Sequence, residues 1–166
     1  FIDSHVHVLD GGRSLRAAVN GQPWRQYLAS EFHWHGSRPF YPRRALRDQR
    51  FHLIHNLLAG RAKPSTGIDG DPAYGLSRDP RFDGTGVRRA FDTFADPPEF
   101  ELYDTQSDPI EFDNLAGQAK HAKVEARLKQ ALLAWRKESA DPFLDPAWID
   151  RWIQQGAPAL AQQKAR

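Results

Sequence analysis

Cysteine and methionine are both missing from the 166 residues of the chain. The lack of cysteine excludes disulfides, thiolate metal sites and a cysteine nucleophile within it. Long apolar runs are missing too, since no stretch approaches the roughly 18 residues that a membrane-spanning helix needs. The opening residues, Phe1 to His5, show neither an initiator methionine nor the basic-then-apolar order of a signal peptide. We therefore expect the chain to be a piece of a longer protein.

A strong excess of charge of one sign is also lacking. The 23 basic and 21 acidic side chains give a formal net charge of +2, and the absence of long like-charge runs disfavours a nucleic-acid partner. The chain contains no P-loop, no G-x-G-x-x-G and no G-x-S-x-G motif, so the common phosphate-binding and acyl-transfer sites have no signature here. The hydrophobic share of 40%, with 5 Trp and 10 Phe, is enough for one globular domain.

Four short segments have the pattern of β-strands. Residues 27–35 alternate and are rich in aromatic side chains, and Phe100 to Tyr103 form another short run. Between them, residues 44–47 and 51–56 are separated by Asp48-Gln49, and this spacing predicts a tight hairpin.

The clearest helix extends from about Gln118 to Ser139. One apolar stripe follows its 3.6-residue period and should face the core: Val124, Leu128, Ala131, Leu132 and Trp135. Glu125 and Lys129 lie one turn apart and form a favourable charge pair. Asp141-Pro142 is expected to end the helix.

The rest of the chain carries fewer elements. Residues 59–98 are rich in proline and glycine and predict a long loop with brief helical turns near residues 71–76 and 87–94. A second helix should open with Asp145 as its cap and Pro146 at its first position.

The first ten residues invite a metal-binding interpretation. Asp3, His5 and His7 share one face of a strand, and an H-x-H pair at the end of a first barrel strand is typical of metal-dependent amidohydrolases. That barrel needs eight βα units and about 250 residues. Neither the length nor the βα alternation is present, so we favour a chance match.

A second set of polar groups lies on one predicted strand. Glu31, His33 and His35 point to the same side of it because they are two residues apart. They could bind a metal ion or an anionic substrate, or form a solvated strand face, and spacing alone favours the solvated face. His52 and His55 differ in parity, so a straight strand places them on opposite faces and excludes them as co-ligands.

The segment from Glu101 to Leu115 reads E-L-Y-D-T-Q-S-D-P-I-E-F-D-N-L. It closely resembles the E-L-Y-D-x-x-x-D-P-x-E-x-x-N-L signature near the C-terminus of type I sulfatases. Gly12 to Leu15 resembles the G-R-S-L that introduces the C-terminal subdomain of that family, and Arg44 to Asn56 is similar to its R-A-V-R-T-x-R-Y-K-x-I-x-N hairpin. The resemblance covers roughly residues 11–142 and is greatest to the heparan N-sulfatase (N-sulfoglucosamine sulfohydrolase) branch.

This resemblance implies an α+β fold. A small four-stranded antiparallel sheet would pack against a long C-terminal helix, as in the sulfatase C-terminal subdomain of an alkaline-phosphatase-like fold. The implied strands are residues 27–35, 43–47, 50–56 and 99–104. The whole chain, 1–166, would be one subdomain with its core at about 12–142 and a C-terminal helix and tail at 143–166.

The resemblance also implies a function, namely the hydrolysis of sulfate esters or N-sulfate groups of sugars such as glycosaminoglycans. In the family, a formylglycine made from a C/S-x-P-S-R motif acts beside calcium, and neither the motif nor the metal ligands occur in this sequence. The chain would then supply no catalytic residue and no metal ligand. Its implied partners are an N-terminal catalytic domain and a sulfated sugar, with no nucleic acid and no membrane.

The same resemblance supplies candidate binding residues. The family's Glu-x-x-aromatic-His pattern maps onto Glu31, Trp34 and His35. The substrate-binding residues expected in this chain are therefore Glu31, His35 and Arg44.

Two other interpretations stay open. One is a stand-alone carbohydrate- or partner-binding module without catalysis, and the other is a metal hydrolase that uses His5 and His7. The choice between sulfate ester and N-sulfate is also open, and so is the compartment of the parent protein, for which the periplasm or secretion is one option.

Overall fold

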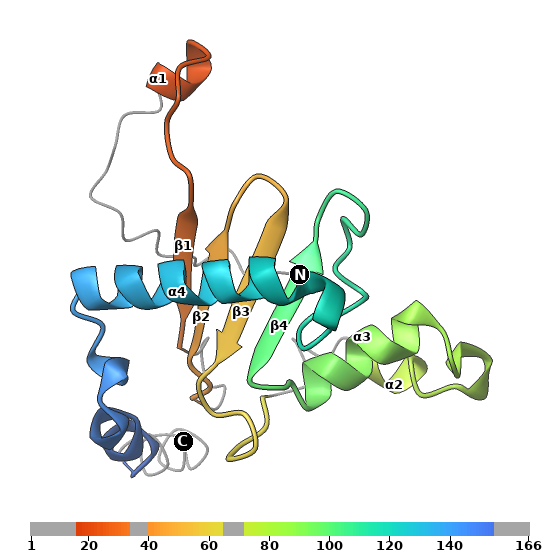
Figure 1. The fold of residues 1–166 in the computed structure, drawn as a ribbon. Helices are drawn as coiled ribbons and strands as arrows, with labels where there is room; N and C mark the ends of the chain where they lie inside the picture. The colour runs from red at the N-terminus through yellow and green to blue at the C-terminus, as the bar shows by residue number, and fades with distance from the viewer. Residues whose placement is uncertain (1–15, 34–39, 65–71, 155–166) are drawn as a thin grey trace.

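The computed structural model describes residues 16–33, 40–64 and 72–154. Its centre is one antiparallel sheet in which each strand pairs with the next along the chain, in the order β1 (Leu28–Phe32), β2 (Arg43–Arg47), β3 (Phe51–Asn56) and β4 (Phe100–Asp104). The long helix α4 (Ala122–Glu138) lies across one face of this sheet (Figure 1). The α+β fold with a four-stranded antiparallel sheet is therefore confirmed.

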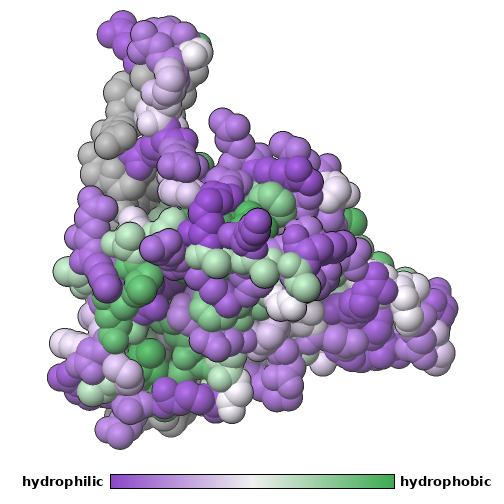
Figure 2. Space-filling view, in the orientation of Figure 1, coloured by the Kyte–Doolittle hydropathy of each residue, from purple (hydrophilic) through white to green (hydrophobic). Residues whose placement is uncertain are grey.

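Shorter helical elements surround this sheet–helix unit. They are α1 (Arg16–Val19), α2 (Ala73–Leu76), η1 (Pro80–Phe82), α3 (Gly86–Ala95), η2 (Ala119–His121), η3 (Pro142–Leu144) and a helical stretch at 146–154. Figure 1 shows α2 and α3 as an arm that projects beyond β4. The helices of this arm bury no residue, and the arm is mostly hydrophilic in Figure 2.

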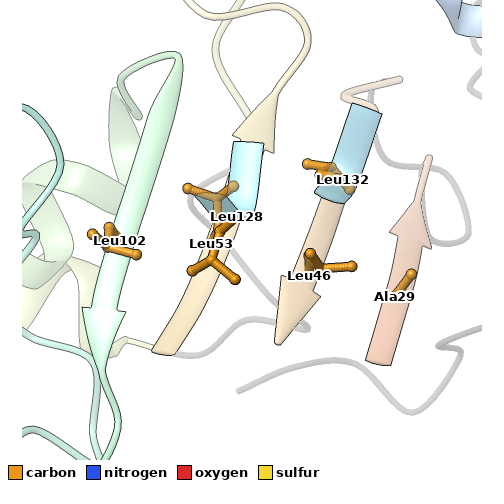
Figure 3. Close-up of a cluster of buried hydrophobic side chains, with 6 residues drawn as sticks. All are labelled: Ala29, Leu46, Leu53, Leu102, Leu128 and Leu132. Carbon is orange, nitrogen blue, oxygen red and sulfur yellow. The ribbon is translucent and has the colours of Figure 1, made fainter. Parts of the chain in front are cut away.

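The core lies between the sheet and α4. Each strand contributes one small or apolar side chain to it, and α4 contributes two leucines one turn apart (Figure 3): Ala29, Leu46, Leu53, Leu102, Leu128 and Leu132. Val124, Ala131 and Trp135 pack at the margin of this cluster. The apolar stripe predicted from the sequence is therefore confirmed, since its five residues all contact the core.

The start and the end of α4 are shaped by neighbouring residues. The predicted helix begins with a 3-10 turn at Ala119–His121, and the backbone N–H of Gly117 donates to the Glu125 carboxylate at 2.8 Å. Lys129 forms the expected pair with Glu125 at 2.6 Å. Ala140 ends the helix in the left-handed region, with φ 50°, and the Asp141 N–H donates to the Arg136 carbonyl at 2.9 Å.

The β2–β3 hairpin turns one residue later than predicted. Asp48 still pairs with Phe51, because the Asp48 N–H donates to the Phe51 carbonyl at 3.0 Å, so Gln49 and Arg50 form the turn. The Asp48 side chain holds it by accepting from the N–H groups of Arg50 at 2.8 Å and Phe51 at 2.6 Å. An aspartate that satisfies two backbone donors explains why no Asn-Gly is needed.

Two further expectations needed correction. The strand predicted over 27–35 covers only Leu28–Phe32 among the described residues, and Trp34 and His35 lie outside them. The turn predicted near 87–94 is a complete helix, α3, because Thr85 caps its first turn by accepting from the Arg88 N–H at 3.3 Å. The Asp145 cap is confirmed, since its carboxylate accepts from the Ala147 N–H at 2.9 Å.

Within the described part of the chain, no helix combines the length and the apolar character that crossing a membrane requires.

Candidate functional site

A row of three polar side chains, continued by Phe100, crosses the sheet next to the core. The strand register pairs Glu31 with Arg44, Arg44 with His55, and His55 with Phe100. Each of these residues is two positions from a core residue of its own strand, so all four side chains lie on the α4 face of the sheet. This row meets the C-terminal end of α4 and the turn that follows it.

Arg44 is the centre of this cluster. Its side chain is fully buried, and it donates to Asp141 through Nε and Nη2, each at 2.8 Å. Its third nitrogen, Nη1, donates to the Arg43 carbonyl at 2.9 Å, and its guanidinium lies 5.1 Å from the centre of the Phe143 ring. The two parallel hydrogen bonds to one carboxylate fix both the position and the plane of the guanidinium.

Asp141 also binds a second arginine. Arg136, in the last turn of α4, donates from Nε to Asp141 Oδ2 at 2.7 Å and from Nη2 to the Phe143 carbonyl at 2.8 Å. The Phe143 N–H donates to Asp141 Oδ1 at 3.0 Å. Burial raises the pKa of Asp141, but the hydrogen bonds from Arg44 and Arg136 outweigh it, and the pKa lies below its usual value.

Glu31 is the member of the cluster that reaches the surface. Its carboxylate lies 3.5 Å from Arg44 Nη2 and 3.8 Å from His33 Nε2, and 18% of its side chain is exposed. The His33 ring meets the Phe143 ring edge-on, with 5.0 Å between their centres. The carboxylate oxygens of a glutamate at this place can accept hydrogen bonds from the hydroxyl or amide groups of a sugar.

His55 completes the row without carrying charge near neutral pH. Its ring stacks on Phe100 with 4.3 Å between the centres. Burial, followed by the positive charges of Arg136, Lys129 and Arg44, lowers the pKa of His55 to about 4. His55 therefore adds no positive charge beside Arg44 and Arg136.

The opposite face of the sheet carries a separate polar group. Glu101 is buried and accepts hydrogen bonds from Asn56 at 2.7 Å and from the Tyr103 hydroxyl at 2.5 Å. His52, on the same face, lies 2.8 Å from the Glu111 carboxylate. His52 and His55 thus lie on opposite faces of the sheet, as their parity predicted.

Several residues of the E-L-Y-D signature make contacts that stabilise the fold. Asp104 accepts three hydrogen bonds from Arg50, at 3.0 and 3.1 Å from Nε and at 2.6 Å from Nη2, and these fasten β4 to the β2–β3 turn. Asn114 accepts from the Leu102 N–H at 2.9 Å, and the Leu115 N–H donates to the Leu102 carbonyl at 2.8 Å. The outer edge of β4 is thereby capped by the end of the same motif. These contacts hold β4 in the sheet, while the reactive groups are offered by the polar row on the α4 face.

The three candidate binding residues have different surroundings. Glu31 and Arg44 are brought together as neighbours on β1 and β2. Arg44 is fully buried, so its guanidinium can reach a ligand only through Glu31 or after a rearrangement. His35 lies outside the described residues, as do Asp3, His5 and His7 of the metal-binding interpretation.

Sequence reasoning missed Arg136 and Asp141. Arg136 lies next to the helical stripe and reads as a surface residue, and Asp141 reads as a helix stop. The Asp-Pro-Phe sequence does signal a cap, because the Asp141 side chain accepts from the N–H of the second residue after it. Nothing local signals that the same carboxylate binds Arg44, which is 97 residues away in the chain.

No group of three or more His, Asp or Glu side chains that could hold a metal ion occurs in residues 16–33, 40–64 and 72–154. The residues described here therefore do not fit the calcium ion that the sulfatase resemblance implies.

Comparison with known proteins gives further evidence about the family of this chain. No family model matches the chain. Human N-sulphoglucosamine sulphohydrolase is 31% identical over 140 residues, which covers 80% of this chain and 27% of the relative. The chain thus spans about a quarter of the length of that curated relative.

Solved structures agree at the level of the fold. A 2-O GAG sulfatase, BT1596, matches with a TM-score of 0.50 and 22% identity, over 80% of this chain and 21% of its own length. A putative sulfatase from Bacteroides thetaiotaomicron matches with a TM-score of 0.50 and 23% identity, over the same shares of the two chains.

Proposed function

Because the chain belongs to the sulfatases, as a C-terminal part of one, we propose that it helps an enzyme to hydrolyse sulfate groups on sugars. The observation that carries this proposal is the 31% identity over 140 residues with N-sulphoglucosamine sulphohydrolase. The name of that relative describes a sulfate on the nitrogen of glucosamine. An N-sulfated amino sugar, as found in glycosaminoglycans, is therefore the first substrate to test.

The chain's own contribution is to shape the substrate cleft. In this proposal the formylglycine nucleophile and the calcium ion belong to an N-terminal catalytic domain, and residues 1–166 form one subdomain beside it. Glu31 and His35 bind the sugar rather than the reacting sulfate, and Arg44 holds Glu31. The 3.5 Å between Arg44 Nη2 and the Glu31 carboxylate, together with the exposure of Glu31, supports this division of roles.

The direct test uses the full-length protein that contains this chain. Sulfate release should be measured on N-sulfated glucosamine and on 2-O- and 6-O-sulfated sugars. The matched control is the same protein with the residue of its C/S-x-P-S-R motif that becomes formylglycine replaced by alanine. Release from at least one of these sugars by the first protein, and from none by the control, is expected.

The stand-alone binding module gives the opposite pattern. It would bind a sulfated sugar in a direct binding measurement and release sulfate from none of them. A full-length protein without a C/S-x-P-S-R motif upstream would also contradict the enzyme proposal.

His35→Ala tests the binding role of the site. A group that touches the sugar in ground and transition states alike contributes uniform binding, so we expect KM to rise while kcat changes little. His52→Ala is the matched control, because His52 lies on the opposite face of the sheet against Glu111 and should leave KM unchanged. An unchanged KM for His35→Ala on every accepted sugar would remove His35 from the site.

A further inference from the structure

We infer that Arg136 and Asp141 are positioning residues for the sugar site, because they fix Arg44 and Arg44 in turn fixes Glu31. This inference rests on the proposed function, in which Glu31 binds the sugar. It adds Arg136, in the last turn of α4, and Asp141, in the turn that follows, which reach Glu31 through Arg44.

The first step is that both oxygens of the Asp141 carboxylate accept two hydrogen bonds each. Oδ1 accepts from Arg44 Nη2 and the Phe143 N–H, and Oδ2 accepts from Arg44 Nε and Arg136 Nε. Only 1% of the Asp141 side chain and 7% of the Arg136 side chain are exposed. With four donors in place, the carboxylate has no alternative orientation of similar energy, and neither has the Arg44 guanidinium.

The second step is the balance of charge. Arg44 and Arg136 carry two positive charges, and Asp141 neutralises one of them. Glu31 supplies the second negative charge at 3.5 Å from Arg44. An uncompensated buried charge is costly. The charge of Arg44 therefore favours an orientation in which the Glu31 carboxylate is directed toward it.

The third step connects the cluster to the strand end. The Phe143 N–H donates to Asp141, and the Phe143 carbonyl accepts from Arg136. The ring of Phe143 lies against both Arg44 and His33. The turn after α4 thus contacts the side chains that flank Glu31 on two strands. A small shift of this turn would move the carboxylate relative to the cleft.

The arrangement predicts an energetic link between Arg136 and Glu31. The test is a double-mutant cycle in the full-length enzyme, with Arg136→Lys, Glu31→Gln and the double variant. Lysine keeps the charge but cannot donate to Asp141 and the Phe143 carbonyl as a planar fork. We expect each single variant to raise KM about 5- to 20-fold with kcat within about twofold, and the double variant to equal Glu31→Gln alone.

Lys137→Arg is the matched control, since Lys137 is the exposed neighbour of Arg136 and should leave KM unchanged. A purely structural role would lower the melting temperature of Arg136→Lys and leave KM as it is, or give independent KM effects that multiply in the double variant. Either result overturns the inference. If Arg136→Lys does not fold, Asp141→Asn, which keeps the shape of the side chain and removes its charge, replaces it in the same cycle with the same two outcomes.

The two proposals fail in different ways. If Glu31→Gln alone leaves KM unchanged, Glu31 does not bind the sugar, and the site assigned under the proposed function is wrong. If Glu31→Gln raises KM and the effect of Arg136→Lys is independent of it, only the positioning role is wrong.

Discussion

Four charged side chains at one end of the sheet differ in how far each reaches solvent. Arg44, Asp141 and Arg136 are buried, and Glu31 is partly exposed. Burial decides what each can do, because a group without access to solvent cannot meet a ligand and acts through its neighbours. A buried ion pair is weak evidence for stability by itself, yet the loss of one partner leaves a charge without compensation.

Asp141→Ala should therefore be strongly destabilising. It leaves Arg44 and Arg136 buried without their shared carboxylate, and we expect the free energy of unfolding to fall by about 3–5 kcal/mol. Asp145→Ala, four residues further, removes only a helix cap at an exposed position and should cost about 1 kcal/mol. Urea denaturation of both variants measures the difference. Similar losses in the two would contradict the role given to Asp141.

His55 should make the stability depend on pH. The pKa of His55 is about 4 in the folded chain, against an ordinary value of 6.5. Between these two values the unfolded chain binds a proton that the folded chain does not. The free energy of unfolding should therefore fall as the pH drops from about 6.5 to about 4, by at most about 3 kcal/mol.

The check compares His55→Gln with the unaltered chain across this pH range. Glutamine cannot titrate, so the variant should lose less stability on acidification. Parallel curves for the two proteins would show that His55 does not carry the effect.

Helix α4 shows how far local sequence patterns reach. The 3.6-residue stripe predicted its buried face because burial of leucines is a local, periodic property. Its last turn was not predictable, since Ala140 takes a left-handed conformation that usually belongs to glycine. The next residue, Asp141, binds Arg44, and this contact between distant parts of the chain is not specified by the local sequence. The position of the hairpin turn was also not predictable from residue types alone. It depends on the hydrogen bonds that the Asp48 side chain accepts from the backbone N–H groups of Arg50 and Phe51.

Leu128→Ala and Leu132→Ala test the packing of α4 on the sheet. Both leucines are buried between α4 and the strands, and each truncation should cost about 2–5 kcal/mol. Leu133→Ala is the matched control on the same helix, because Leu133 is 43% exposed, and it should change stability by less than about 1 kcal/mol. Chemical denaturation measures the free energy of unfolding of the three variants. Equal losses would mean that α4 packs through another face.

The chain as a whole joins segments that are distant in sequence. The four-stranded antiparallel sheet followed from the family resemblance, and the pairing of β2 with β3 also followed from the short spacing between them. The contact between Arg44 and Asp141 could not be predicted, because it spans 97 residues and no local pattern specifies it. The candidate site was therefore anticipated only in part. Glu31 followed from strand parity and family resemblance, and Arg44 from the resemblance alone. The groups that hold them required the three-dimensional structure.

The isolated chain should release no sulfate from sulfated sugars, with or without calcium. It has no cysteine and no C/S-x-P-S-R motif from which formylglycine could form. Incubation of the purified 166-residue chain with the sugars used for the full-length protein provides the measurement. Sulfate release above that of the inactive full-length variant would require a different mechanism from the one proposed.

Asn56 joins the two ends of the segment that carries α2 and α3. Its backbone N–H donates to the Glu99 carbonyl at 2.8 Å, and its side-chain amide donates to the Pro98 carbonyl at 2.8 Å. The chain therefore leaves the sheet after β3 and returns to it before β4 at almost the same point. The entropy of closing such an excursion grows only slowly with its length. This is a place where evolution can lengthen, shorten or exchange an insertion while the sheet and its polar row keep their geometry.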